Sequence, residues 1–182
     1  MANTSARSPG TAVNDTSFGA LAWDDPNNIK VSDDVSATVD GDVVDERARI
    51  VNADGTIGTT DKSIADDWSS SYAYVSYGSS TDLWGETWTA ADINDANFGF
   101  ALAIFDRAFD IPQDSNYLKG TNFGFSISEG STINGILVEV KRKVAGPNFF
   151  TKVAYVDHMR ITVYYTEASS YNPAFAHRRL LL

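Results

Sequence analysis

Large apolar residues occupy every second position in several stretches of the chain. The clearest are two copies of one pattern, at residues 96–102 and 121–127. Their large apolar residues are Phe98, Phe100 and Leu102 in the first copy and Phe123, Phe125 and Ile127 in the second. A period of two places such side chains on one face of a strand. The pattern therefore predicts two similar, half-buried strands that bury aromatic side chains.

The opposite face of these two predicted strands carries only small residues, namely Gly99, Ala101, Gly124 and Ser126. A face without bulky side chains lets another backbone approach closely. We expect this flat face to receive either its neighbour in a second sheet or an arm from another copy of the chain.

Alternation predicts further strands along the chain. The most regular alternations lie at residues 135–144 and 159–166. Shorter strands are expected at 29–31 and 35–39, where polar turns rich in Asp, Asn and Pro frame them. Residues 46–60 predict a hairpin, because an Asp-Gly pair separates two alternating runs.

Only one short helix is expected. Thr89 and Asp92 have the spacing of a capping box, which predicts a helical turn at about 90–95. Many short alternating strands separated by Gly, Pro, Asn and Asp turns are typical of a β-sandwich or jelly roll. The sequence therefore predicts an all-β domain over residues 21–167, with an extended N-terminal arm at 1–20 and a C-terminal tail at 168–182.

The two ends of the chain are too short and too irregular to build cores of their own. Terminal segments are ordered only where something holds them. We expect both to lie on neighbouring subunits of a homo-oligomer, the alternative being that they fold back on their own domain. The residues expected to bind a partner are Tyr171, Phe175, Arg178, Arg179, Leu180 and Leu182.

The charge balance excludes some partners. The chain has 24 acidic and 14 basic residues, for a formal net charge of -10. Nucleic acid and anionic membranes require a basic face, so neither is an expected partner. There is no cysteine, and therefore no disulfide or thiolate metal site. The first ten residues lack the apolar core of a secretory signal, and no stretch approaches a membrane span, so we expect a soluble product.

Candidate catalytic chemistry is sparse. The chain has two histidines; His158 alternates with Arg160 on an outward strand face, and His177 lies in the tail. No Gly-x-Ser-x-Gly elbow is present, so we predict no catalytic residue and no enzyme activity. No cofactor is expected, with calcium left open as a ligand of acidic turns. The candidate calcium ligands are Asp24, Asp25, Asp33 and Asp34.

Aromatic residues allow a second kind of function. Tryptophan and tyrosine on a β-sandwich can stack on sugars, although most aromatic residues belong to cores or interfaces. Trp68 is flanked by acidic and serine residues, which predicts exposure. Trp68 and Tyr72 are therefore the candidate glycan contacts.

Several segments resemble a generally uncharacterised, β-rich family of tailed-bacteriophage and phage-like proteins that is associated with virion structure. The similar segments include an Asn-Tyr-Leu-Lys block that runs on through Thr-Asn-Phe-Gly-Phe-Ser-Ile, and an Asp-Leu-Trp-Gly block, and they lie at 33–38, 77–85, 88–94, 116–143 and 156–166. In that family the Asn-Tyr-Leu-Lys block precedes the Asp-Leu-Trp-Gly block, whereas here it follows. The family's strand order is therefore not transferred to this chain.

The resemblance implies a virion structural protein, assembled in the host cytoplasm, and it supplies no catalytic residues. Capsid decoration or cementing is the first expectation, and a neck or tail component the second. The expected partners are other copies of the chain and other virion proteins. The alternative is a β-sandwich module that binds a glycan or a host receptor.

Overall fold

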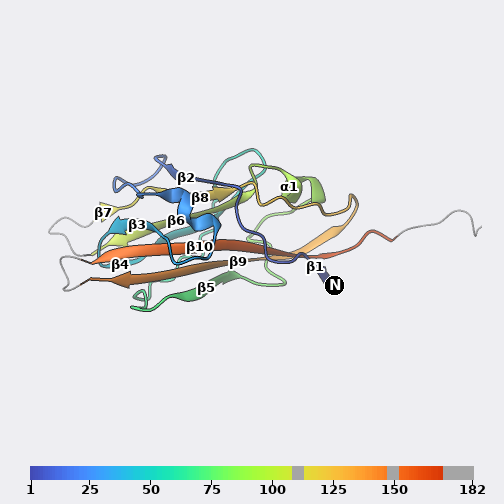
Figure 1. The fold of residues 1–182 in the computed structure, drawn as a ribbon. Coiled ribbons are helices and arrows are strands. Elements are labelled where there is room, and N and C mark those ends of the chain that lie inside the picture. The colour runs from blue at the N-terminus through green and yellow to red at the C-terminus, as the bar shows by residue number, and fades with distance from the viewer. Residues whose placement is uncertain (108–112, 147–151, 170–182) are drawn as a thin grey trace, which may run out of the picture.

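The chain folds as a sandwich of two β-sheets. The computed structural model describes residues 1–107, 113–146 and 152–169. Within these residues, ten strands form two antiparallel sheets of five strands each, which face one another across the core (Figure 1). The prediction of an all-β sandwich is confirmed.

The first sheet is built on two long neighbouring strands, β9 (Thr132–Ala145) and β10 (Val153–Thr166), of 14 residues each. Strand β5 (Ala73–Gly78) pairs with the other edge of β9, and β3 (Ala37–Asp40) pairs with the start of β10. At about 3.3 Å per residue, each long strand extends about 45 Å. The two long strands follow the alternations predicted at 135–144 and 159–166.

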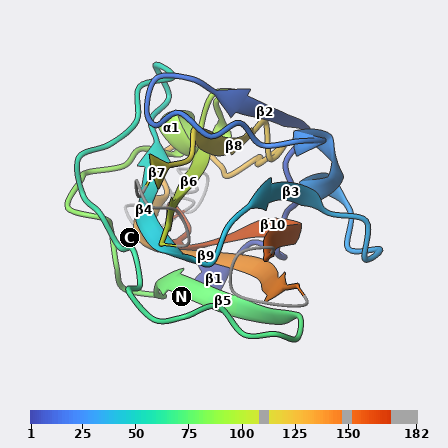
Figure 2. The same ribbon diagram turned by 90° about the vertical axis from the view of Figure 1, so that its left-hand side faces the viewer.

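The second sheet has the order β2 (Thr11–Asp15), β8 (Tyr117–Thr121), β6 (Gly99–Asp106) and β4 (Val43–Val51). The two-residue strand β7 (Gln113–Asp114) pairs with the end of β6. Figure 2, which looks along the strands, shows the two sheets as separate layers. The predicted hairpin turn follows β4, where the backbone N–H of Gly58 donates to the carbonyl of Ile50 at 2.8 Å.

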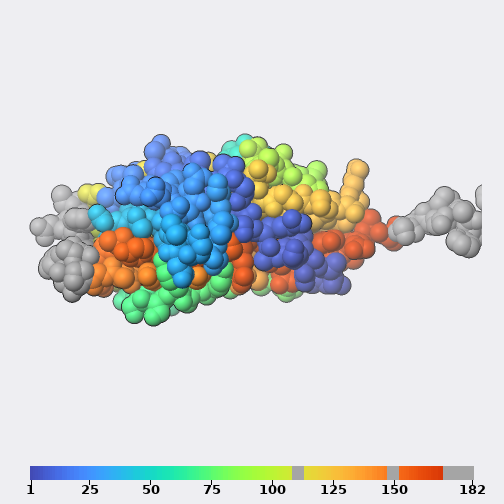
Figure 3. All heavy atoms as spheres, in the orientation of Figure 1, coloured from blue at the N-terminus to red at the C-terminus, as the bar shows by residue number. Residues whose placement is uncertain are grey.

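The N-terminal segment is shared between the two sheets of its own domain. Strand β1 (Ala2–Asn3) pairs with the end of β10, and Arg7 bridges to Ile161 on the same strand. The chain then crosses to the second sheet, where β2 pairs with β8. Figure 3 shows this segment, in dark blue, lying across the side of the sandwich. Residues 1–20 are thus not a free arm: they fold back on their own domain.

Two helical segments lie between the strands. The α-helix α1 (Ala90–Asn94) begins at Thr89, whose side chain accepts from the backbone of Asp92 while Asp92 accepts from Thr89. This capping box confirms the predicted helix. The strand expected at 29–31 is wrong, because Pro26–Lys30 forms the 3-10 helix η1. Proline in the first turn fits a helical start, since its fixed φ suits the helix and its missing N–H has no partner there.

The two copies of the repeated pattern adopt different structures. The first copy enters β6 as predicted, but residues 122–128 are not a strand. Asn122 and Gly124 have φ angles of 59° and 65°, in the left-handed region, which breaks the extended backbone. Phe123 and Phe125 are nevertheless buried. Alternate burial was predicted correctly, whereas the second strand was not.

The small-residue face of the first copy is occupied by the same chain. A Cβ added at Gly99 would lie 2.0 Å from the carbonyl oxygen of Gly120 on β8. Gly124 has no atom within 4 Å of the corresponding position. The close approach expected at this face is therefore made at Gly99 by the neighbouring strand.

The core lies between the two sheets. It joins alternate residues of β6, β9 and β10 with Trp84 and with Val43, Ala48 and Ile50 of β4. Phe100 packs edge-on against Trp84, with ring centroids 6.0 Å apart. The outward positions of β4 therefore fall to Arg47 and Arg49, which are the residues that matter for the site described below.

Candidate functional site

Trp68, predicted to be exposed, lies inside the sandwich. Its residue is only 5% exposed, and its indole N–H donates to a carboxylate oxygen of Asp45 at 2.9 Å. Tyr72 is half-buried, and its ring lies 4.1 Å from the Lys143 ammonium. Lys143 faces away from the core, so Trp68 and Tyr72 do not share a surface. The predicted exposure of Trp68 is therefore wrong, whereas the glycan contact at Tyr72 stays a prediction.

Asp45 is the centre of a buried polar network that holds Trp68. Its carboxylate accepts from the backbone N–H of Ile64 at 3.1 Å and from the hydroxyl of Tyr77 at 2.9 Å, and it forms an ion pair with Arg142. The guanidinium also lies 4.4 Å above the Trp68 ring. Asp45 belongs to the second sheet and Arg142 to the first, so the network ties the sheets together. The groups that donate hydrogen bonds to Asp45 all point into the sandwich, so the network has a structural role.

His158, predicted to lie on the surface, is 8% exposed. Its two ring nitrogens hydrogen-bond to the hydroxyls of Ser8 and Tyr74, both at 2.8 Å. Burial lowers the pKa of His158; the positive charge of Arg160 lowers it further, while Asp157 opposes the shift. A serine–histidine contact of this length suits nucleophile activation. Here the second nitrogen meets a tyrosine hydroxyl rather than a carboxylate, and the contact fastens the N-terminal segment to β10.

The four candidate calcium ligands do not form a ligand set. Asp34 makes an ion pair with Lys141 at 2.9 Å, and Asp33 accepts from the backbone N–H of Val35 at 3.1 Å. Across residues 1–107, 113–146 and 152–169, no three His, Cys, Asp or Glu side chains gather in a way that could hold a metal ion. Asp24 and Asp25 lie in the exposed turn before η1.

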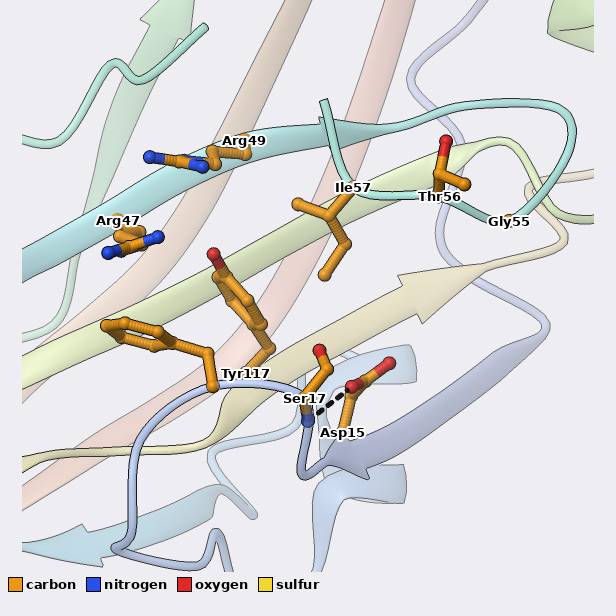
Figure 4. Close-up of a pocket in the computed structure, with 9 residues that line it drawn as sticks. Asp15, Ser17, Arg47, Arg49, Gly55, Thr56, Ile57 and Tyr117 are labelled. Carbon is orange, nitrogen blue, oxygen red and sulfur yellow. Dashed lines mark hydrogen bonds between the residues drawn. The ribbon is translucent and has the colours of Figure 1, made fainter. Parts of the chain in front are cut away.

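A depression of about 440 Å³ lies on the outer face of the second sheet (Figure 4). The side chains of Phe18, Ile57 and Tyr117, which line it, pack in one cluster with Ala101 and Ala103 of the central strand β6. Phe18, from the loop after β2, and Tyr117, from β8, line one side. The lining of the depression thus combines large side chains from segments that flank the small residues of β6.

Arg47 and Arg49 project from β4 at one end of this depression (Figure 4). The Arg47 guanidinium lies 3.8 Å from the centre of the Phe18 ring, which in turn packs against Tyr117 at 5.3 Å. Arg49 donates one hydrogen bond, from Nε to a carboxylate oxygen of Asp61 at 3.0 Å. Arg47 makes no hydrogen bond or ion pair with any residue that the structure describes.

The other end of the depression is acidic and hydroxylated. Figure 4 shows Asp15 and Ser17 there, joined by a 3.0 Å hydrogen bond from the Ser17 backbone N–H. Burial tends to raise the pKa of Asp15, but hydrogen bonds from Lys119 and Ser17 outweigh it and hold the pKa below its ordinary value. Asp15 is therefore a carboxylate at neutral pH, able to accept hydrogen bonds.

Sequence reasoning did not find this depression. The alternation of Arg47 and Arg49 with apolar residues placed both arginines outside the core, which was the available signal. Phe18 and Tyr117 come from segments far apart in the chain, and nothing local indicates that they meet. The predicted partner-binding residues 171–182 lie outside the described residues.

Comparison with protein-family models, with curated proteins and with solved structures finds no match for this chain. Among the residues that the structure describes, no helix has the length and apolar character needed to cross a membrane.

Proposed function

We propose that the chain is a structural protein of a phage-like virion that binds neighbouring copies or other virion proteins. The proposal assigns it a binding role and no reaction. Its main support is that the residues shared with the virion-associated family are those that build the sandwich. Trp84, Trp88 and Phe123 are all buried in the common core. The resemblance thus concerns the whole body of the fold rather than one short motif.

The architecture favours the C-terminal tail as the tether. The N-terminal segment is already used within its own domain, where Thr4 and Arg7 donate backbone hydrogen bonds to β10. Strand β10 ends at Thr166, at the same end of the sandwich as β1. The sequence beyond it combines apolar residues with Arg178 and Arg179, in a chain whose formal net charge is -10. Opposite charge favours contact of this tail with the acidic body of another subunit.

Deleting residues 170–182 tests this proposal. We expect the shortened chain to keep its thermal midpoint, because residues 1–169 supply both sheets and the core described above, and to lose incorporation into particles. Particle incorporation is measured by mass spectrometry of purified virions from cells that supply either version. A variant with Arg178 and Arg179 replaced by serine separates charge from length. Equal incorporation of the shortened and full chains would exclude the tail as the tether.

The position in the particle is a separate question. We propose capsid decoration first, with the neck or tail as the alternative site. Immunogold electron microscopy with an antibody against the sandwich domain distinguishes these positions directly. Labelling spread over the capsid supports decoration, and labelling at one vertex or along the tail supports the alternative. Complete absence of label and of the chain from purified particles would refute a virion role.

A further inference from the structure

We propose that the depression in Figure 4 binds a saccharide ring that bears a carboxylate, such as a uronic or sialic acid. This inference goes beyond the virion role and does not depend on it. It also replaces the glycan site predicted at Trp68, because that side chain is buried while this depression is open.

At the end of the depression formed by Arg47 and Arg49, guanidinium N–H groups lack acceptors among the described residues. A guanidinium carries five N–H donors in a planar fork that matches the two oxygens of a carboxylate. Stacking on Phe18 at 3.8 Å fixes the plane of Arg47, and its N–H edges have no partner among the described residues. Arg49 uses only Nε in its bond to Asp61, so its terminal nitrogens remain available. A planar anion would satisfy both groups.

The middle of the depression suits a ring with hydroxyl groups. Tyr117 is only 3% exposed, but Figure 4 shows its hydroxyl end turned toward Arg47 and Arg49. No hydrogen bond from this hydroxyl to another described residue is present, and the same holds for the Ser17 hydroxyl. Ile57 adds an apolar side chain beside Tyr117. A sugar ring is complementary to this surface, because it too has polar edges around an apolar patch.

The acidic end decides between a sugar acid and a simple anion. A phosphate at Arg47 would fill a small part of about 440 Å³ and would leave Asp15 and Ser17 unused. A sugar acid that places its carboxylate at Arg47 extends its hydroxyls toward Asp15, which accepts hydrogen bonds as a carboxylate. Lys119 forms an ion pair with Asp15, and Arg49 with Asp61. The charge of Glu46 acts on Arg47 and Arg49 without forming an ion pair with either. Arg47 forms no ion pair with a described residue, so a ligand carboxylate could pair with it directly.

Saturation-transfer NMR and calorimetry on the full chain test the inference, with glucuronate, N-acetylneuraminate, neutral glucose and inorganic phosphate as probes. We expect one of the acidic sugars to bind at least about tenfold more tightly than glucose and phosphate, because hydrogen bonds to charged groups contribute about that much. Arg47→Gln should weaken binding by a similar factor. Tyr117→Phe, which removes one hydroxyl and keeps the ring, should weaken it about threefold to tenfold.

Arg7→Gln is the matched control, since Arg7 lies at β10 on the other sheet and should leave binding unchanged. Thermal midpoints of all variants establish that they are folded. Three results would overturn the inference: binding of glucose as tight as that of the acids, phosphate binding as tight as that of the acids, or no binding of any probe at millimolar concentration. Unchanged affinity in Arg47→Gln would show that any bound acid sits elsewhere. None of these results bears on particle incorporation, so the two proposals fail separately.

Discussion

Replacing Asp45 with alanine should destabilise the sandwich more than any other single removal of an acidic side chain. The carboxylate is fully buried and makes an ion pair with the Arg142 guanidinium, whose side chain is only 5% exposed. Removing one member of a buried pair costs about 3–5 kcal/mol, because the other charge remains without compensation. The indole of Trp68 and the hydroxyl of Tyr77 also lose their acceptor. We expect a loss of about 5 kcal/mol in the free energy of unfolding.

A loss of this size is a large part of the total, since domains are stable by about 5–15 kcal/mol. For a chain of this length it corresponds to a fall in the thermal midpoint of roughly 10–20 °C. Urea unfolding followed by tryptophan fluorescence measures it well, because all four tryptophans are buried. Asp67→Ala is the matched control: Asp67 also pairs with an arginine, at 2.8 Å, but its side chain is 75% exposed. Exposed pairs contribute about 0–1 kcal/mol.

The same measurement in an Arg142→Met background tests the cause. If the penalty arises from an uncompensated guanidinium, Asp45→Ala should cost distinctly less once that guanidinium is absent. The reasoning is refuted if Asp45→Ala costs no more than Asp67→Ala, or if its cost is the same in both backgrounds.

Three further predictions concern other parts of the fold. Gly99→Ala should lower the free energy of unfolding in urea by at least about 3 kcal/mol, because its Cβ would meet a backbone carbonyl at 2.0 Å. Gly124→Ala has free space around the new Cβ and should cost about 1–2 kcal/mol, for its left-handed backbone alone. Burial lowers the pKa of His158 in the folded chain, so the unfolded chain binds a proton at this histidine first as the pH falls below about 6.5, and stability should decline there. In a His177→Gln background, His158→Gln should remove this decline. An unchanged pH profile would contradict the assignment to His158. Deleting residues 2–9 should lower the thermal midpoint, because the edge of β10 loses its partner. The exposed edge should also cause concentration-dependent association, which light scattering detects. A monomer of unchanged stability would count against a structural role for this segment.

The sequence predicted secondary structure best where the alternation of apolar and polar residues runs along a whole strand. Strands β9 and β10 were predicted because apolar and polar residues alternate over their length. Even so, Arg142 occupies an inward position of β9, two residues after Val140 and two before Val144. A charge at such a position signals a buried partner, but only the fold shows that the partner is Asp45 on the other sheet.

Exposure was predicted poorly where it depends on distant contacts. Trp68 is surrounded by acidic and serine residues, yet a carboxylate 23 positions earlier draws its indole into the core. His158 was placed correctly on an outward face, but the N-terminal segment covers that face through Ser8. Neither contact has a local pattern that would have predicted it.

The twin pattern shows how far local similarity extends. The copies share the order Asn, Phe, Gly, Phe, and both bury their aromatic residues. Only the first copy is a strand, because β4 and β8 pair with it on either side. In the second copy, left-handed Asn122 and Gly124 replace strand geometry with a turning backbone. Side-chain burial followed the residue pattern, whereas backbone conformation followed the tertiary setting.

The pairing of Ala2 with Tyr165 has a consequence for biosynthesis. On a ribosome, residues 2–3 emerge long before β10, the strand they must join. They wait without a partner until β10 has been synthesised and has emerged. Contacts between such distant positions make folding slow. The N-terminal segment, residues 1–20, is polar and rich in serine, threonine and asparagine. This composition suits a segment that is exposed to water during that interval.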